Sequence, residues 1–493
     1  MKKEDTVSSP LANLQPQLVW KHFDALRQIP RPSKHEEKVA AHVIAWATER
    51  GFEVRRDAAG NVVVAVPATP GHEGAPIVVL QGHLDMVAEK NQDVQFDFLT
   101  DPINVRIEGD YVYATGTTLG ADNGVGVAAA MAIADDPEAV HGPLELLMTV
   151  DEETGLTGAQ QLDPSLLAGR ILINLDTEED GALYIGCAGG ADCNAIFTVT
   201  REAASMATMP LRISVRGLRG GHSGVDIHEN RGNALKFLLR ALDALRLAGI
   251  DFELVSLAGG SKHNAIPRES DAIIRAAKDT AAVRGEIERV AAVLKEEYGE
   301  IDPNQRFEVA ELEDCDEYRR VMSMADRERL LDTLLACPHG VLGMSRAVPG
   351  LVESSHNLAV VVTEGDQVKV TTSGRSSVMP TLKAVMRQVE VIFRLGGATP
   401  HVGGGYPGWK PNPDSPVLKT ATRVFERELG GTPHIRAIHA GLECGLIGEK
   451  FPGMDMVSMG PQIESPHSPD ERVQISTVDR FYRLLKATLA ELA

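Results

Sequence analysis

IVVLQGHLDMV, residues 77–87, predicts a buried strand that ends on polar side chains, and it decides the fold expected for this chain. Its first part is a short run of aliphatic residues, which is typical of a strand covered on both faces of a sheet. His83 and Asp85 follow that run. Residues two apart on an extended segment face the same side, so Asp85 can orient the imidazole of His83.

Two further apolar runs end in the same way. LELLMTV (144–150) leads into Asp-Glu-Glu, and ILINL (171–175) leads into Asp-Thr-Glu-Glu. Helical patterns separate these strands, and such alternation predicts an α/β fold, a mostly parallel sheet with helices on both faces. Ligands bind where the strands of such sheets end, so we expect these acidic residues and His83 at one site.

A helix is predicted before this sheet. Ser33 and Glu36 fit a capping box ahead of KVAAHVIAWATERG, and Gly51 fits the stop of that helix. In a capping box each of the two side chains accepts the backbone N–H of the other residue.

The pattern changes after about residue 195. Alternating runs such as LRISVRG (211–217) are followed by a helical pattern at 230–248, and a second set of strands and a helix occupies 358–394. We interpret this region as an inserted α+β domain of two successive small units. The two units would form a duplicated module, although the sequence shows no clean repeat.

The domain boundaries follow from this change of pattern. GGGYPGWKPNPDSP (403–416) is rich in glycine and proline and is typical of a linker. Strands and helices alternate again after it. We therefore predict a discontinuous catalytic domain, residues 1–190 and 402–493, with residues 191–401 inserted as a lid domain.

Composition and charge limit the partners. The 493 residues carry a formal net charge of −20, which argues against nucleic-acid or anionic-membrane binding, because such binding needs a basic surface. The N-terminal MKKEDTVSSP lacks the apolar core of a signal peptide, and no apolar run is long enough to span a bilayer. The five scattered cysteines contain no CxxC pair and so predict neither a disulfide framework nor a thiolate zinc site. We expect a cytoplasmic protein.

The candidate metal ligands are two histidines and three carboxylates: His83, Asp122, Glu153, Asp176 and His467. Zinc, cobalt and manganese accept such N and O donors, and five ligands suit two metals if one carboxylate bridges them. Asp122, in the glycine-rich TLGADNGVG, is the expected bridge. We expect His83 and Glu153 on one metal, His467 and Asp176 on the other, and the adjacent Glu152 as an unligated general base. From the pattern alone, ordinary surface or helix-capping carboxylates are an open alternative.

Five motifs carry a resemblance to a known family. QGHLDMV, TLGADNGVGVA, TVDEETGLTGA, NLDTEEDG and ESPHSPDE resemble the metal-site motifs of the M20 metallopeptidases, most closely their aminoacyl-histidine dipeptidase branch. The resemblance runs nearly end to end, with the motifs in family order. It implies that the five candidates bind two zinc ions, with Co²⁺ or Mn²⁺ as alternatives. It also implies that Glu152 is the general base, that Asp85 supports His83, and that a cis peptide bond follows Asp122.

Further candidates concern substrate binding. His222 lies in GLRGGHSGVDIHENRGNA, Asn264 in GGSKHNAIPRE and Arg375 in TTSGRSS. The resemblance implies that His222 stabilises the oxyanion formed at the scissile carbonyl. It also implies that Arg375 binds the substrate carboxylate, for which its planar guanidinium is suited. The Asn264 amide is a candidate for binding the same carbonyl or carboxylate, and Glu443, in HAGLECG, matches a motif linked to substrate binding.

These expectations describe a cytoplasmic di-zinc dipeptidase that hydrolyses Xaa-His and related dipeptides, including carnosine-like and Cys-Gly-like ones. The inserted domain would close so that His222 and Arg375 reach the metals. An N-acyl amino acid deacylase or a tripeptidase of the same superfamily is the main alternative, and a non-catalytic binding protein is a remote one. The sequence leaves open whether the protein is a homodimer and whether His222 acts within one chain or across that dimer.

Overall fold

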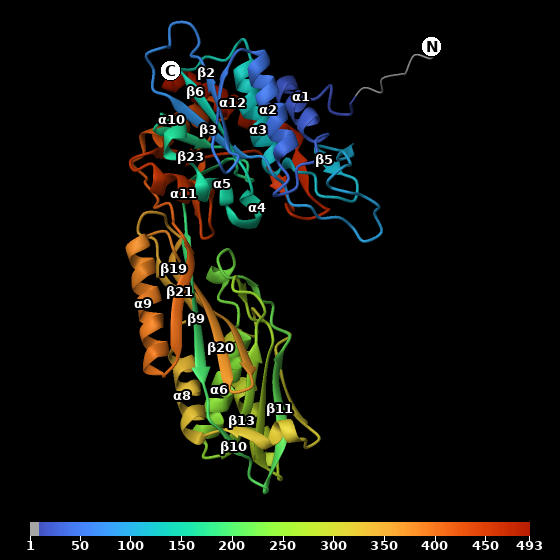
Figure 1. Cartoon of the computed structure of the whole chain (residues 1–493), viewed down its shortest axis with the longest axis vertical. Coiled ribbons are helices and arrows are strands. Elements are labelled where there is room, and N and C mark those ends of the chain that lie inside the picture. The colour runs from blue at the N-terminus through green and yellow to red at the C-terminus, as the bar shows by residue number, and fades with distance from the viewer. Residues whose placement is uncertain (1–8) are drawn as a thin grey trace. The chain divides into compact units, whose positions relative to one another are not determined.

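The computed structural model describes residues 9–493, which divide into two compact units (Figure 1). Unit 1 comprises the described residues up to Gly186 together with Pro411–Ala437 and Leu442–Ala493. Unit 2 comprises Cys187–Lys410 and Ile438–Gly441. The segment that we interpreted as unlike a signal peptide lies largely in residues 1–8, outside the described residues. Within residues 9–493, no helix has both the length and the hydropathy that crossing a membrane requires.

The main sheet of unit 1 has eight strands. Their spatial order is β1 (Glu53–Arg56), β2 (Val62–Val66), β6 (Leu144–Thr149), β3 (Val78–His83), β7 (Ile171–Asn174), β23 (Asp455–Ser458), β8 (Ala182–Cys187) and β22 (His434–Ile438). The four central strands β6, β3, β7 and β23 are parallel, and β1, β2 and β8 pair antiparallel. Every residue of β3 and β6 is buried, so both faces of the sheet are covered. The predicted α/β class is confirmed.

Helices of unit 1 pack on this sheet. They are α1 (Gln17–Leu26), α2 (Glu37–Glu49), α3 (Ala121–Asp135), α4 (Glu152–Gly155), α5 (Thr157–Gln161), α10 (Pro416–Glu428), α11 (Glu443–Lys450) and α12 (Ile475–Leu492), with the short 3₁₀ turn η1 (Pro164–Leu166). Helix α3 contacts β3 and β6 on one side and α1 and α12 on the other. That position explains its sequence, because a helix enclosed by other elements is apolar all round.

The capping-box interpretation is wrong. Helix α2 begins where it was expected, but neither Ser33 nor Glu36 caps it. The Ser33 hydroxyl donates to Asp85 at 2.7 Å, and the Glu36 carboxylate accepts the backbone N–H of Asp151 at 2.9 Å. Both side chains thus bind the loops that follow β3 and β6, because the parallel sheet brings those loops beside the start of α2.

A second, smaller sheet in unit 1 positions two distant segments. It has the order β24 (Ile463–Glu464), β25 (Arg472–Gln474), β5 (Tyr111–Ala114) and β4 (Val105–Glu108). The turn between β24 and β25 contains His467, and the chain leaving β5 runs into α3, which contains Asp122. Because β25 pairs with β5, these two candidate ligands leave neighbouring strands.

Unit 2 is built on one nine-stranded antiparallel sheet. Its spatial order is β16 (Arg306–Glu311), β11 (Thr208–Arg216), β15 (Ser270–Ala277), β13 (Phe252–Gly259), β19 (Val352–Glu364), β20 (Gln367–Ser376), β9 (Gly189–Thr198) and β21 (Thr399–Tyr406), with β18 (Gly340–Met344) beside β19. Two short pairs, β10 (Arg201–Ala203) with β17 (Arg320–Met322) and β12 (Gly221–His222) with β14 (Ala265–Ile266), lie outside this sheet.

The helices of unit 2 share one hydrophobic core with this sheet. They are α6 (Ala234–Leu247), α7 (Ala281–Tyr298), α8 (Met324–Ala336) and α9 (Met379–Leu395), with the 3₁₀ turns η2 (Ile227–Glu229) and η3 (Asp316–Arg319). All four helices contribute to the core, together with alternate residues of β9 such as Cys193, Ala195 and Phe197. The intervening residues Asn194 and Ile196 are exposed, so the helices cover one face of the sheet.

The expected duplication is visible in the strand order. The segment β11–α6–β13–β15–α7–β16 and the segment β9–α8–β19–β20–α9–β21 have the same succession of elements. In each, the spatial order is fourth, first, third and second strand, and the two second strands, β13 and β19, pair. The two repeated segments are not successive as predicted, because the segment β11–β16 lies wholly between β9 and α8 of the other segment.

The glycine-rich segment after residue 402 was expected to be a linker, and its first part is a strand instead. β21 pairs with β9 along Thr399–Tyr406, and a side chain at Gly405 would lie 3.1 Å from the carbonyl oxygen of Gly190. The glycines therefore permit close pairing at a sheet edge. The chain leaves unit 2 only after Lys410, and Ile438–Gly441 returns to it.

Candidate functional site

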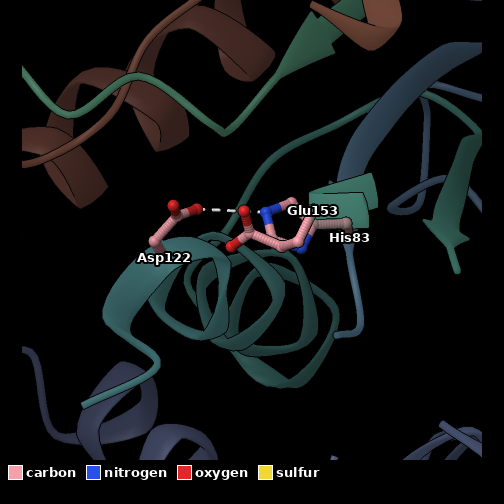
Figure 2. Close-up of side chains that lie close together, drawn as sticks. All are labelled: His83, Asp122 and Glu153. Carbon is pink, nitrogen blue, oxygen red and sulfur yellow. Dashed lines mark hydrogen bonds and ion pairs between the residues drawn. The ribbon is translucent and has the colours of Figure 1, made fainter. Parts of the chain in front are cut away.

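Asp122 lies at the centre of a histidine–carboxylate cluster in unit 1. Figure 2 shows the side chains of His83, Asp122 and Glu153 turned toward one another from β3, α3 and α4. His83 Nε2 lies 3.0 Å from Asp122 Oδ1, and His467 Nε2 lies 3.1 Å from Asp122 Oδ2. One carboxylate thus faces a different imidazole with each oxygen, which is the arrangement that a bridging ligand requires. A cis peptide bond follows Asp122, as the family resemblance implied.

The remaining two carboxylates lie next to different histidines than expected. Asp176 Oδ1 is 3.4 Å from His83 Nε2, and Glu153 Oε2 is 3.0 Å from His467 Nε2. These contacts join His83 to Asp176 and His467 to Glu153, the opposite of the sequence-based pairing, although His83, Asp122 and Glu153 also have one ligand atom each within 4.8 Å of one another. The reason is strand register: β7 pairs directly with β3, Gln81 opposite Asn174, so the residues two positions further on lie level with each other.

The cluster fits divalent cations. Within residues 9–493, Glu153 Oε1 and Asp176 Oδ1 are buried oxygens without a hydrogen-bond donor. Buried polar atoms are normally paired, and carboxylate oxygens and imidazole nitrogens are ligands that zinc and similar metals accept. Hydrogen bonds that the imidazole of His467 donates to Asp122 and Glu153 raise the pKa of His467 to about 11, a sign of concentrated negative charge. The chemistry of this donor set therefore suits two cations that share Asp122.

Asp85 holds more than the His83 ring. Its Oδ1 lies 3.3 Å from His83 Nδ1, as the sequence spacing predicted. The same carboxylate accepts the backbone N–H groups of Glu152 at 3.0 Å and Glu153 at 3.2 Å. Asp85 therefore links the imidazole to the start of α4, where the candidate base and a candidate ligand lie side by side.

Glu152 lies where its carboxylate can carry a proton. It opens α4 after Asp151, whose φ of 51° lies in the left-handed region. Burial raises the pKa of Glu152 well above its usual range; His83 opposes this shift and Asp176 adds to it. A carboxylate with a raised pKa beside a metal site is suited to accept a proton and return it.

Glu443 lies deeper than a surface binding residue. Its side chain is 1% exposed, and Oε2 accepts hydrogen bonds from Gln81 at 2.5 Å and Thr149 at 2.7 Å. Burial raises the pKa of Glu443 to about 7. Oε1 has no donor among the described residues. Its predicted role in substrate binding stays a prediction.

Sequence reasoning did not single out Glu178 or Asp151 at this site. Burial, with Asp122 next in importance, raises the pKa of Glu178 to about 9, and its signal was its place in the DTEED run. Glu36, Asp85 and Asp151 form a second acidic group, with one ligand atom of each within 4.8 Å. Their oxygens accept backbone N–H groups and hydroxyls, which gives this group a structural role.

The predicted residues of the inserted region gather in unit 2. β12 pairs with β14, and Ser223 N–H donates to the Asn264 carbonyl at 2.8 Å, which holds His222 beside Asn264. A side chain at Gly224 would lie 3.1 Å from His222 Cε1 and 3.2 Å from Arg375 Nε, and it would collide with the His439 carbonyl oxygen. His222, Arg375 and His439 therefore surround Gly224.

The backbone selects one tautomer of His222. Its Nδ1 accepts the N–H groups of Gly224 at 3.2 Å and Val225 at 3.0 Å. In a neutral imidazole the hydrogen then resides on Nε2. Burial, reinforced by Arg375, lowers the pKa of His222 to about 4. His222 is therefore a neutral N–H donor near neutral pH, which suits it to stabilise a developing oxyanion.

We expect His222 to stay neutral as the pH falls from 6.5 toward about 4. Its pKa in the folded protein lies below the unfolded value, so its contribution to stability is present above pH 6.5 and is lost as the pH falls toward 4. Imidazole ¹⁵N chemical shifts measure both tautomer and titration. A hydrogen on Nδ1, or a midpoint at 6.5 or above, would contradict the assignment.

Arg375 presents a buried guanidinium. Its side chain is 6% exposed, and Nη1 donates to the Tyr406 hydroxyl at 2.7 Å. Arg375 Nε has no acceptor within residues 9–493. The ring of Tyr406 fits between Gly190 and Gly441, at each of which a side chain would come within 2.8 Å of it. A buried arginine with a free N–H and a fixed orientation suits a carboxylate ligand. No sequence pattern pointed to Tyr406.

Replacing Gly224 with alanine should impair catalysis through His222. The added methyl group would collide with the His439 carbonyl and press on the His222 ring. We expect kcat/KM to fall by about tenfold or more, the effect of misplacing one oxyanion donor, without loss of bound metal. Gly285→Ala is the matched control, because nothing lies within 4 Å of that position. An unchanged kcat/KM in Gly224→Ala would contradict this prediction.

Comparison with known proteins identifies the family of this chain. The family model for peptidase family M20/M25/M40 matches residues 79–491. The chain is 41% identical to the cytosol non-specific dipeptidase of Escherichia coli over 485 residues, 98% of this chain and 99% of that protein. It is 43% identical to the crystal structure of aminoacylhistidine dipeptidase from Vibrio alginolyticus, with a TM-score of 0.92 and 98% of each chain covered. Aminopeptidase PepT from Bacillus cereus, at 18% identity and a TM-score of 0.57, shares the fold over 97% of this chain and 99% of its own. The chain therefore belongs to peptidase family M20/M25/M40 and is a metal-dependent peptidase.

Proposed function

We propose that this protein is a di-zinc dipeptidase that hydrolyses Xaa-His and related dipeptides. The observation that carries the proposal is Asp122, whose two oxygens face His83 and His467 at 3.0 and 3.1 Å. The donor-free oxygens of Glu153 and Asp176, among the described residues, complete the proposed ligand set. The names of the relatives from Escherichia coli and Vibrio alginolyticus, both dipeptidases, support a dipeptide substrate.

In this proposal, His83, Asp176 and Asp122 would hold one cation, and His467, Glu153 and Asp122 would hold the second. When bound, the cations lower the pKa of a water molecule and polarise the scissile carbonyl. Glu152 accepts the proton of the attacking water and returns it to the leaving amine. Asp85 keeps the base and His83 in a fixed relation through the backbone of Glu152.

The unit 2 cluster completes the proposed site on the substrate. The Nε2–H of His222 donates to the oxygen of the scissile carbonyl as negative charge develops there. Arg375 binds the terminal carboxylate of the dipeptide, and the Asn264 amide assists it. The reaction requires both clusters to act on one substrate molecule, and the lid domain closes to allow this.

A substrate panel tests the proposal directly. The zinc-loaded protein is assayed with β-Ala-His, other Xaa-His dipeptides, Cys-Gly, a tripeptide and N-acetyl amino acids, each with and without a chelator. We expect hydrolysis of the dipeptides that the chelator abolishes. Preferred hydrolysis of N-acetyl amino acids or of the tripeptide would favour a deacylase or a tripeptidase instead.

Metal identity, cellular location and assembly also belong to this proposal. Zinc is the proposed metal, and Co²⁺ or Mn²⁺ reconstitution in the same assay distinguishes the alternatives. The Escherichia coli relative, a cytosol dipeptidase, supports a cytoplasmic location, and the net charge of −20 supports a protein that binds neither nucleic acid nor membrane. Light scattering at assay concentration decides whether the protein is a homodimer.

Replacing Tyr406 with phenylalanine should weaken binding of the substrate carboxylate. The change removes the acceptor of Arg375 Nη1 without altering the ring that fits between the glycines. Hydrogen bonds to charged groups contribute about 1.5–3 kcal/mol, so we expect KM to rise about tenfold with little change in kcat. A C-terminally amidated dipeptide should show no such rise. Tyr184→Phe, which loses a bond to Glu179 instead, is the control. A lower kcat with unchanged KM would contradict the role.

A further inference from the structure

One buried carboxylate accepts four consecutive backbone N–H groups where the chain enters α3. Glu471 is 2% exposed. Its Oε2 accepts from Leu119 at 2.7 Å and Gly120 at 3.0 Å. Its Oε1 accepts from Ala121 at 2.8 Å and Asp122 at 3.3 Å. The N-terminal N–H groups of a helix lack partners within the helix, and here a single side chain supplies them.

Arg31 binds the same turn by donating a hydrogen bond to the carbonyl oxygen of Gly120. It is also 2% exposed, and its Nη2 donates to the carbonyl oxygen of Gly120. Its Nη1 donates to the carbonyl oxygens of Leu84 at 2.9 Å and Asp85 at 2.8 Å. The backbone of Gly120 is thus held on one side by Glu471 and on the other by Arg31.

These two side chains connect the three segments that supply the proposed ligands. Arg31 joins the carbonyl of Leu84, directly after His83, to the carbonyl of Gly120, two residues before Asp122. Glu471 joins the segment of Asp122 to the turn that contains His467, four residues before it. Neither Arg31 nor Glu471 was a candidate ligand. Among the described residues, neither forms a hydrogen bond or ion pair with Glu152 or Glu153.

We propose that Glu471 and Arg31 are positioning residues that fix the spacing of His83, Asp122 and His467 before metal binds. The inference rests on the proposed function for the identity of the ligands. Groups that orient metal ligands from behind commonly change metal affinity or activity by about 10–100-fold when they are lost. If the spacing is formed before metal binds, none of the free energy of metal binding is needed to order the three segments.

The chemistry of the carboxylate makes a sharp variant available. An ionised carboxylate only accepts hydrogen bonds and has two oxygens, whereas glutamine has one oxygen and an NH₂ group that donates. In Glu471→Gln the NH₂ group therefore faces two of the four N–H donors, and the turn at Asp122 must shift. Arg31 also loses the negative charge across Gly120.

The experiment compares the metal affinity of full-length wild type, Glu471→Gln and Glu464→Gln by competition of Zn²⁺ with a chromophoric chelator. Glu464 lies in the same segment, but it binds Arg472 and Tyr111, which contact none of the proposed ligands. We expect about 10–100-fold weaker metal binding in Glu471→Gln and wild-type affinity in Glu464→Gln. The visible absorption spectrum of the Co²⁺-loaded protein should change only in the Glu471 variant.

A second pair of variants keeps the inference testable if Glu471→Gln does not fold. Glu471→Asp retains the charge but is one methylene shorter, and Arg31→Lys retains the charge but lacks the fork that reaches three carbonyls. Both variants should bind metal more weakly than the wild type. The melting temperature of the metal-free protein should change little in either variant. A lower melting temperature with wild-type metal affinity and Co²⁺ spectrum would show a merely structural role and overturn the inference. A wild-type protein that binds no metal would instead contradict the proposed function.

Discussion

Replacing Glu152 with glutamine should lower kcat by about 10²–10⁴-fold, the range that general acid–base groups contribute, while the protein still binds its metals. Glutamine keeps the size of the side chain and cannot accept the proton of the attacking water. Glu152 is next to Glu153 in sequence but is not a proposed ligand, so metal content should not change.

The measurements are initial rates on a dipeptide and metal content by mass spectrometry on the same sample. Glu49→Gln, which removes an exposed carboxylate of α2, is the control and should have wild-type kcat. Near-normal turnover of Glu152→Gln with full metal content would show that another group is the base. Loss of metal from this variant would show instead that Glu152 is a ligand.

Replacing Asp122 with asparagine should remove metal and activity together. Asp122 is the carboxylate that faces both imidazoles, and the neutral amide offers one oxygen in place of two. We expect metal content to fall from about two ions to below one per chain, because a shared ligand is lost from both sites. Activity should fall to the detection limit.

The other end of the same helix supplies the control for this variant. Asp136 follows α3 and binds Lys486 and Tyr482, far along the helix from the metal ligands. Asp136→Asn should keep full metal content. His467→Ala should lose about one ion, because His467 faces a single oxygen of Asp122. Two ions per chain in either Asp122→Asn or His467→Ala would contradict the ligand assignment.

Short-range patterns predicted the elements of the catalytic unit well. The apolar run at 77–82 became β3, and its buried residues occupy both faces as a parallel central strand requires. The same reasoning identified the polar residues at the strand ends, because the side chains that leave a parallel sheet at one edge meet there. These predictions depend only on residues close together in the sequence.

Patterns that depend on distant partners were interpreted incorrectly. Ser33 and Glu36 have the spacing of a capping box, yet Ser33 binds Asp85. Glu36 accepts the nearby Lys34 N–H and also the Asp151 N–H, 115 positions away. The segment from Gly403 looked like a linker because glycine and proline disfavour regular structure. It forms part of β21 because β9, about 200 residues earlier, provides an edge on which glycines pack closely.

The sequence alone determined which side chains form the candidate metal centre, because imidazole and carboxylate donors at strand ends are recognisable one motif at a time. Only the tertiary structure decided which of them make direct contacts: strand register puts Asp176 3.4 Å from His83, and Glu153 lies 3.0 Å from His467. It also identified Glu471, whose carboxylate reaches Leu119 across 352 positions of sequence. Hydrogen bonds of this kind leave no periodic pattern, since the chain must fold before their partners meet.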